Sequence, residues 1–318
     1  MSEIGNLYTH QRFVFMTLDP VHIGTGGYRL GRVDNTIVRE PGTYLPKIPG
    51  TSLMGAARSY SSMYYGKPEA AGQHKMLKKD QKINCPIIYT FGTATEVGGG
   101  QAGKISIGDA QILLFPVHSM AGPVWVSTIE MLQSAGFKLD KQNVNDETAV
   151  TSLSWEKDNI NLGWLMLKVT KGLTVDAPKE IKTNEWDSIA KRIILVSQKL
   201  FSHIANNNLE VRTSVAINPE TGTAEDKALF KYEALPRATF LWCDIIEDDY
   251  SNSFPLTDKR YKNKKENEGE LLNKSWKSPM DVVRTGFKLA EYLGVGGMST
   301  RGFGRIKTIG DWEVTNES

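Results

Sequence analysis

The sequence predicts an α+β fold, with a split βαβ arrangement favoured over a doubly wound parallel sheet. Segments with strand periodicity alternate with amphipathic helices, and one pair of strands is joined by strong turn chemistry as a hairpin. The sequence has neither a repeat of fixed period nor a linker that divides it cleanly. We therefore expect a single domain over residues 1–318, with inserted segments.

The first predicted unit is a strand at residues 12–19, a glycine-rich loop at 20–50 and a helix at 51–65. Thr51 and Ser52 are residue types that cap helices at their N-termini. The helix prediction rests on apolar and aromatic residues at helical spacing, namely Leu53, Ala57, Tyr60 and Tyr64. Residues 66–104 are polar and are expected to form a peripheral loop region with basic residues at Lys75, Lys78, Lys79 and Lys82.

The middle of the chain is predicted to hold a central strand at residues 105–115, which Pro116 should end, and a short helix at 123–135. Residues 138–183 are expected to be peripheral, with one strand at 164–169. Residues 186–206 give the clearest helix prediction in the chain, because one apolar stripe runs through Ile189, Ile193, Val196, Leu200 and Ile204.

The last third predicts a hairpin, since strands at 209–217 and 229–235 flank the turn sequence Asn218–Thr223. A strand at 239–246 and an exposed, charged segment at 247–276 should follow. The final elements are a helix at 280–293, a second glycine-rich loop at 294–304 and a closing strand at 305–309.

Bulk composition is typical of a soluble globular protein, with 40% hydrophobic and 23% charged residues. The net charge of +2 is too small for histone-like affinity, so any RNA-binding surface must come from local patches. Two cysteines make neither a disulfide framework nor a zinc site, and a reducing cytoplasm is the expected location. We find no signal peptide and no apolar run long enough to span a membrane.

The most informative segment runs from His22 to Arg58. It contains one histidine, one aspartate and several basic residues on a backbone rich in glycine. Such a loop can lie close to a phosphodiester chain and place an acid/base pair beside it. The segment therefore indicates a protein that binds or processes RNA.

The chain resembles the RAMP superfamily of CRISPR proteins, and most closely the backbone subunits of type III-B (Cmr) effectors, which cut target RNA. The resemblance extends over most of the chain, in four stretches that follow the expected order: 22–58, 102–117, 217–223 with Tyr232, Glu233 and Pro236, and 293–305. The backbone subunits of type III-A (Csm) effectors share the first stretch and are the second choice.

The resemblance implies a modified ferredoxin-like (RRM-like) core with inserted fingers and a thumb, the thumb being the hairpin at 217–232. It implies copies stacked in a helical filament along a guide crRNA, together with other Cmr subunits and a single-stranded target RNA. The thumb would wedge into the guide–target duplex at regular intervals. Asp34 matches the catalytic aspartate of the family, and His22 matches a second active-site position.

Cleavage by the 2′-hydroxyl of the RNA requires a base, charge stabilisation at phosphorus and in-line geometry. Asp34 could hold a divalent cation, Mg²⁺ or Mn²⁺, or act as the base. A histidine can transfer protons near neutral pH, so His22 could assist. Glu233, beside the thumb, is a third candidate. The alternatives are that Asp34 only caps a turn and that His22 is structural.

The resemblance also suggests residues that contact RNA. Arg39, Lys47, Ser52 and Arg58 would contact the guide backbone, with Ser52 at a helix N-terminus that favours anions. Met54 stands where the family commonly has lysine, so one expected phosphate contact is missing or moved. In the second glycine loop the candidates are Gly296, Gly297, Ser299, Arg301 and Arg305.

Two other functions compete with RNA cleavage. The first is a filament subunit that holds guide and target RNA without cutting, because the same phosphate contacts serve both roles. The second is a nucleotide-binding metabolic enzyme built on the glycine loops. It is disfavoured because the sequence lacks the strand–GxGxxG–helix and GxxxxGK[ST] patterns.

Overall fold

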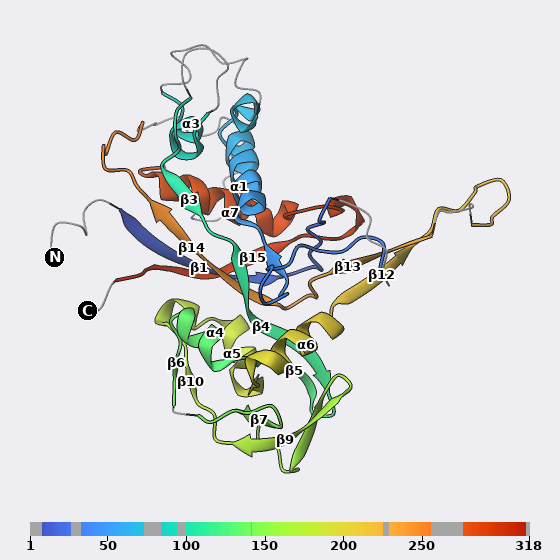
Figure 1. Ribbon diagram of the computed structural model, residues 1–318. Coiled ribbons are helices and arrows are strands. Elements are labelled where there is room, and N and C mark those ends of the chain that lie inside the picture. The colour runs from blue at the N-terminus through green and yellow to red at the C-terminus, as the bar shows by residue number, and fades with distance from the viewer. Residues whose placement is uncertain are drawn as a thin grey trace.

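Figure 1 shows the computed structural model, which describes residues 8–26, 33–72, 84–93, 100–140, 142–224, 229–255 and 276–315. The α-helices in these ranges are α1 (Gly50–Tyr64), α3 (Pro86–Phe91), α4 (Ile129–Ser134), α5 (Asn184–Ile189), α6 (Gln198–Asn207) and α7 (Pro279–Leu293). Short 3-10 helices are η2 (Pro68–Ala71), η4 (Lys179–Ile181), η5 (Ala190–Arg192) and η6 (Ser299–Arg301). The predicted α+β class is confirmed.

The central sheet has the order β15-β1-β14-β4, and its neighbouring strands are antiparallel. It consists of β15 (Ile306–Glu313), β1 (Thr9–Thr17), β14 (Phe240–Glu247) and β4 (Ala110–Ser119), with the short strands β2 (Lys47–Ile48) and β3 (Ile105–Ile107) beside them. β1 lies between β15 and β14, which agrees with the apolar run Phe13–Met16 in its sequence.

Alternate side chains of β1 face two different hydrophobic clusters. Phe13 and Phe15 pack edge-to-face against Phe287 of α7, in the cluster that also contains α1. Val14 faces the cluster that contains residues of α4 and α5. Figure 1 accordingly shows α1 and α7 above the sheet and α4 and α5 below it.

A second group of strands continues the sheet from β4 into the lower half of Figure 1. Its order is β4-β5-β11-β7-β9-β8. These strands are β5 (Gly122–Ser127), β11 (Ile193–Leu195), β7 (Thr148–Thr151), β9 (Leu165–Lys171) and β8 (Asn159–Leu162), and β6 (Lys138–Leu139) pairs separately with β10 (Val175–Asp176). The described part of residues 138–183 thus holds five strands, where the sequence indicated one.

The predicted helix at 186–206 is wrong in its middle. The chain forms α5 and η5, then the buried strand β11, and then α6, whose N-terminus is capped by the Ser197 hydroxyl accepting the Leu200 N–H. β11 pairs in parallel with β5 and antiparallel with β7. The apolar run Ile193–Leu195 satisfies both a helical stripe and a buried strand, so periodicity could not separate the two.

Two further predictions near Pro116 are wrong. Pro116 does not end its strand, because β4 changes partner there: β14 pairs with it as far as Leu114, and β5 pairs with it from Phe115 onward. A proline is tolerated where one edge of a strand is unpaired. Residues 123–135 form β5 and the short helix α4 rather than one helix.

Helix α1 is confirmed, but its predicted cap is not. Pro49 occupies the N-cap position, and Thr51 and Ser52 lie in the first turn. The Gly50 N–H donates to Asp109 Oδ1 at 2.7 Å, so a carboxylate from a distant loop satisfies the helix end. The strand at 239–246, the helix at 280–293 and the hairpin are confirmed, the hairpin as β12 (Glu210–Ser214) and β13 (Phe230–Ala234).

The β12–β13 hairpin extends away from the body of the molecule (Figure 1). Apolar side chains along it are exposed, namely Val211, Val215, Ile217 and Leu229. The predicted basic residues at 75–82 lie outside the described residues, as do residues 256–275 of the charged segment expected at 247–276. Within the described ranges, no helix has both the length and the apolar character needed to cross a bilayer.

Helices α1 and α7 approach each other closely at Gly286. A Cβ at this position would meet the Ala57 carbonyl oxygen and lie 2.5 Å from the Ala57 Cα. Close by, the Ser61 hydroxyl donates to the Val282 carbonyl at 2.7 Å, which holds the two helices in this register. The packing of α1 on α7 therefore depends on a glycine at position 286.

We predict that Gly286→Ala lowers the free energy of unfolding by about 1–3 kcal/mol, because the two backbones must separate. Gly55→Ala is the matched control: Gly55 lies in α1, with nothing within 4 Å of an added Cβ. It should stabilise the protein by about 0.4–1 kcal/mol through helix propensity. Urea unfolding measures both, and equal midpoints for the two variants would contradict the predicted close contact.

Candidate functional site

The first glycine loop lies against strand β13, at the base of the hairpin. Asn35 forms a parallel bridge with Tyr232, in which the Asn35 N–H donates to Lys231 O and the Glu233 N–H donates to Asn35 O, both at 3.0 Å. On the other side of the loop, Val21 and Leu235 exchange two hydrogen bonds of 2.9 Å. Two segments of the loop therefore hold one strand of the hairpin.

Asp34 is exposed at this junction. Its Oδ2 accepts the Lys231 N–H at 2.7 Å, so the carboxylate is oriented by the hairpin strand. The alternative for Asp34 was that its carboxylate only caps a local turn. The observed bond instead joins residues 197 positions apart in the sequence. The carboxylate is thus accessible to solvent and held beside the hairpin.

His22 is buried, with 6% of its surface exposed. Its Nδ1 lies 2.6 Å from the Glu233 carbonyl oxygen. Because a carbonyl can only accept, Nδ1 carries the hydrogen, and in the neutral ring Nε2 can accept a proton. A Cβ at Gly24 would lie 3.1 Å from Nε2, so glycine leaves room beside this nitrogen.

A pocket of about 450 Å³ opens beside His22. Asn35, the neighbour of Asp34, lines the same pocket, so both candidate catalytic positions lie at or next to one cavity. The other lining residues are Gly24, Thr25, Gly26, Thr36 and Met298. The sequence placed His22 and Asp34 in one loop, and in the structure His22 lines the pocket while Asp34 lies next to its lining residue Asn35.

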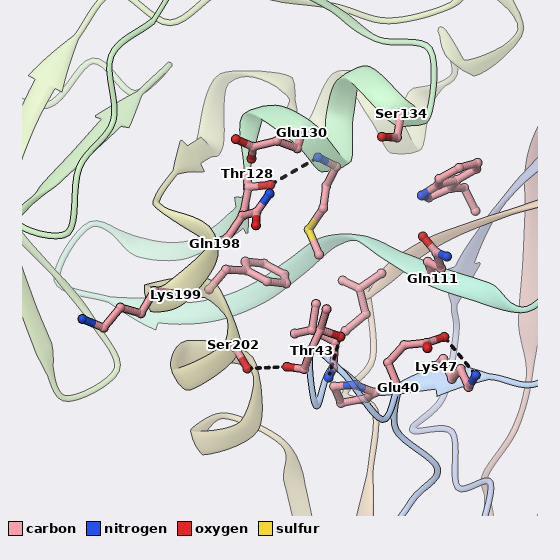
Figure 2. Close-up of a pocket in the computed structure, with 16 residues that line it drawn as sticks. Glu40, Thr43, Lys47, Gln111, Thr128, Glu130, Ser134, Gln198, Lys199 and Ser202 are labelled. Carbon is pink, nitrogen blue, oxygen red and sulfur yellow. Dashed lines mark hydrogen bonds and ion pairs between the residues drawn. The ribbon is translucent and has the colours of Figure 1, made fainter.

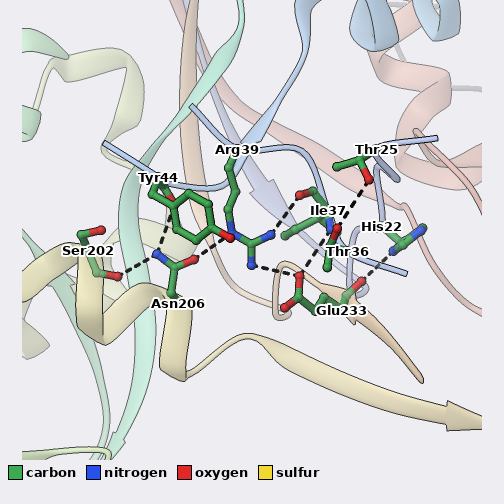
Figure 3. A network of polar contacts seen from close by, with 9 residues as sticks. All are labelled: His22, Thr25, Thr36, Ile37, Arg39, Tyr44, Ser202, Asn206 and Glu233. Carbon is green, nitrogen blue, oxygen red and sulfur yellow. Dashed lines mark hydrogen bonds and ion pairs between the residues drawn. The ribbon is translucent and has the colours of Figure 1, made fainter. Parts of the chain in front are cut away.

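Glu233 takes part in a polar network that Figure 3 shows in full. Its Oε2 accepts Arg39 Nη2 at 2.9 Å, and the two side chains are 14% and 9% exposed. Arg39 also donates from Nε to Asn206 Oδ1 at 2.9 Å and from Nη1 to Ile37 O at 3.0 Å. The predicted contact of Arg39 with guide RNA stays a prediction, and it requires the guanidinium to leave these partners.

The second glycine loop packs its backbone onto His22. The Gly297 N–H donates to His22 O at 3.0 Å, and a Cβ at Gly296 would lie 2.6 Å from the same oxygen. Ser299 and Arg301 are exposed in η6, and the Arg301 guanidinium lies 5.8 Å from the Phe230 ring of the hairpin. This loop therefore joins the first loop and the hairpin at one surface.

Arg305 follows the second loop and is exposed. It binds Asp19 through Nε at 2.5 Å and Nη2 at 2.9 Å. The hydrogen bond from Arg305 lowers the pKa of the Asp19 carboxyl, and the same bond raises the pKa of Arg305. Arg305 thus connects β15 to the chain that leads into the first loop.

Lys47 and Ser52 lie near the start of α1. Lys47 Nζ binds Asp109 Oδ2 at 2.5 Å and Glu40 Oε1 at 2.9 Å. These bonds, that to Asp109 first, raise the pKa of Lys47. Ser52 is half-buried in the first turn of α1. A phosphate at this point would compete with two carboxylates for the ammonium of Lys47.

Arg58 is neither a solvated helix residue nor a free cation. Its Nε donates to Ala70 O at 3.0 Å, and its Nη2 donates to Gly92 O at 2.8 Å. Burial lowers the pKa of this guanidinium. In the structure Arg58 joins α1 to η2 and to the end of α3, and its predicted contact with RNA stays a prediction.

A second pocket, of about 540 Å³, lies between residues 40–47 and the helices α4 and α6 (Figure 2). Its apolar lining includes Met131, Phe201 and Trp242, and neither Asp34 nor His22 reaches it. The Ser202 hydroxyl donates to Thr43 O at 3.0 Å across its wall. This pocket therefore lies apart from the candidate catalytic residues.

Asn206 and Tyr44 are the parts of the network that sequence reasoning missed. Asn206 lies in α6, 167 positions from Arg39, and the Arg39 guanidinium stacks on Tyr44 at 5.0 Å from the ring centre. Neither residue lies in a recognisable motif. Only the fold brings them together, so the sequence contains no local signal for them.

Within the described residues, no three His, Cys, Asp or Glu side chains gather into a metal-binding group. Asp34 is an accessible single carboxylate. Mg²⁺ is commonly held by one or two carboxylates together with substrate phosphates and water. Asp34 therefore fits a cation that takes its other ligands from bound RNA and water.

A profile of the RAMP superfamily matches residues 14–307. The CRISPR system Cmr endoribonuclease Cmr4 of Pyrococcus furiosus is 33% identical over 250 residues, which are 72% of this chain and 79% of that protein.

Two solved structures share the fold of this chain. One is a crystal structure of oligomeric Cmr4 from Pyrococcus furiosus, with a TM-score of 0.57 and 21% identity over 97% of this chain and 99% of that one. The other is a cryo-EM structure of the type III-B Cmr-beta bound to cognate target RNA. It has a TM-score of 0.61 and 14% identity over 94% of this chain and 97% of that one.

We predict that Gly296→Ala lowers the free energy of unfolding by about 1–3 kcal/mol, because residue 296 has φ +88° and its new Cβ would meet Ile23 and His22 O. Gly297→Ala is the matched control, since its Cβ would come no closer than 3.7 Å and its backbone does not require glycine. Thermal unfolding of both variants measures the difference in their stability. A tolerated Ala at 296 would show that the loop does not pack on His22.

Proposed function

This chain belongs to the RAMP superfamily, as a type III-B backbone subunit, and we propose that it binds guide crRNA and cleaves complementary target RNA at regular intervals. The proposal rests on one observation. The accessible Asp34 carboxylate is held by a 2.7 Å bond to the backbone of the hairpin that would distort the RNA. Chemistry and substrate distortion would therefore occur at the same place.

The hairpin would act as the thumb. Its exposed apolar side chains, Val211, Val215, Ile217 and Leu229, suit a wedge that unstacks bases. A displaced nucleotide can rotate its 2′-hydroxyl into line with the scissile phosphate, which supplies the geometry for cleavage. In this arrangement the thumb positions the RNA, and the first loop carries out the chemistry.

Asp34 would hold a divalent cation, Mg²⁺ or Mn²⁺, which when bound stabilises the negative charge that develops at phosphorus. Without a role for the cation, the same carboxylate could accept the 2′-hydroxyl proton. His22 presents Nε2 to the pocket and could transfer a proton to or from the reacting oxygens. Each role uses a group that is already oriented by a hydrogen bond.

RNA binding would use the surface formed by the two glycine loops and the start of α1. Arg301 and Ser299 are exposed there, and the backbone of Gly296 and Gly297 allows close approach of a phosphate chain. Ser52 lies in the first turn of α1, where the helix dipole favours anions. Copies of this chain and other Cmr subunits would extend this surface along the guide.

A non-catalytic filament subunit is the competing function. The ion pairs that engage Arg39, Lys47 and Arg305 inside the protein suit a scaffold as well as an enzyme. Whether the assembled complex loses cleavage when the Asp34 charge is removed distinguishes the two.

We predict that Asp34→Asn in the assembled complex slows single-turnover cleavage by at least about 100-fold while target affinity stays the same. The asparagine oxygen can still accept the Lys231 N–H, so the charge is lost and the bond between loop and hairpin is kept. Asp158→Asn, which changes an exposed carboxylate in the bend before β8, is the control. Undiminished cleavage by an intact Asp34→Asn complex would remove Asp34 from the mechanism.

We further predict that excess EDTA stops cleavage by the purified complex and that added Mg²⁺ or Mn²⁺ restores it. Target binding, measured by gel shift under the same conditions, should persist, because protein cations rather than the metal would hold the RNA backbone. Full cleavage in EDTA would contradict the proposed role of the divalent cation, and Asp34 would then act as the base.

A further inference from the structure

We infer that Glu233 is a positioning residue that aligns His22 and the Asp34 loop, and that Arg39 and Asn206 hold Glu233 in place. This inference rests on the proposed function, because it assigns a role within the same cleavage site. It differs from a direct chemical role for Glu233, which the sequence left open. Figure 3 shows the residues concerned.

Glu233 makes a separate contact with each part of the site. Its N–H donates to Asn35 O at 3.0 Å, next to Asp34 in the chain. Its carbonyl oxygen accepts His22 Nδ1–H at 2.6 Å. Its carboxylate binds Arg39. A displacement of this one residue would therefore move the Asp34 loop and the His22 ring together.

The carboxylate of Glu233 is poorly placed to exchange protons with RNA. It is 14% exposed and ion-paired at 2.9 Å to a guanidinium that is itself 9% exposed. The same oxygen, Oε2, also lies 3.4 Å from the Ile37 N–H. Figure 3 shows this group directed at Arg39, while His22 is bound through the backbone carbonyl on the other side. These contacts hold the Glu233 side chain in place and leave it no direct part in proton transfer.

Arg39 is held in turn by helix α6. Asn206 of α6 accepts Arg39 Nε at 2.9 Å, and its Nδ2 donates to Tyr44 O at 3.1 Å and to Ser202 O at 2.9 Å. These donor bonds leave the amide oxygen facing the guanidinium. The position of Glu233 therefore depends on a residue in α6, which lies outside both glycine loops.

The backbone bond to Glu233 also selects the tautomer of His22. With Nδ1–H bound to the carbonyl, Nε2 is the nitrogen that faces the pocket. If Glu233 shifts, this bond lengthens and the Nε2–H tautomer, which cannot accept a proton at Nε2, becomes populated. The tautomer of His22 is thus a direct readout of positioning, independent of cleavage.

The test compares Glu233→Gln, Glu233→Ala and Asn206→Ala, each assembled into the complex. One carboxylate oxygen accepts both side-chain bonds, so a glutamine oxygen can replace it. We expect Glu233→Gln to keep its cleavage rate within about three-fold of wild type, because the geometry is preserved. Glu233→Ala and Asn206→Ala should slow single-turnover cleavage by about ten-fold or more, with target affinity unchanged. Asn207→Ala, the exposed neighbour on α6, is the matched control.

The second measurement is ¹⁵N NMR of protein labelled at histidine, which contains five histidines in all. Wild type and Glu233→Gln should show His22 with Nδ1–H, and Glu233→Ala and Asn206→Ala should show a mixture of tautomers. If Glu233→Gln cuts as slowly as Glu233→Ala, the carboxylate acts chemically and the inference is wrong. An unchanged tautomer in both alanine variants also overturns it. If wild type does not cut at all, the proposed function fails, while the tautomer still decides the positioning role.

Discussion

The arrangement of the site depends on the backbone pairing between Asn35 and strand β13. Two hydrogen bonds of 3.0 Å join the first glycine loop to the hairpin, across nearly two hundred residues of sequence. These backbone bonds join the two segments, and the ion pair of Glu233 with Arg39 fixes the joined segments to the rest of the protein. The hairpin and the loop with the candidate catalytic residues are therefore bound to each other, so that a movement of the hairpin would carry Asp34 with it.

Four of the five basic residues that were predicted to contact RNA are bound by other groups of the protein. Arg39, Lys47 and Arg305 each pair with a carboxylate, and Arg58 is bound to backbone carbonyls. Such pairs contribute more to orientation than to net stability, because desolvation offsets much of the attraction. The site thus gains a defined geometry from its charges, while backbone amides, η6 and the hairpin present the accessible surface.

Local sequence patterns predicted the secondary structure correctly where a pattern is compatible with only one type of element. Helices α1 and α7 and strands β1 and β14 follow directly from periodicity, and turn residues marked the β12–β13 hairpin. Periodicity failed at Ile193–Leu195, because an apolar run buried between β5 and β7 has the same composition as a helix stripe. It failed again at Pro116, where the change of strand partner is a property of the sheet.

By itself the sequence determined the α+β class, the family resemblance and the presence of His22 and Asp34 in one glycine loop, because these are properties of neighbouring residues. Tertiary structure alone decided that Glu233 binds His22 through its backbone, and that Asn206 supports Arg39 from α6. The physical reason is that these contacts join residues more than 160 positions apart. Their spacing is set by sheet register and helix packing, which no local pattern encodes.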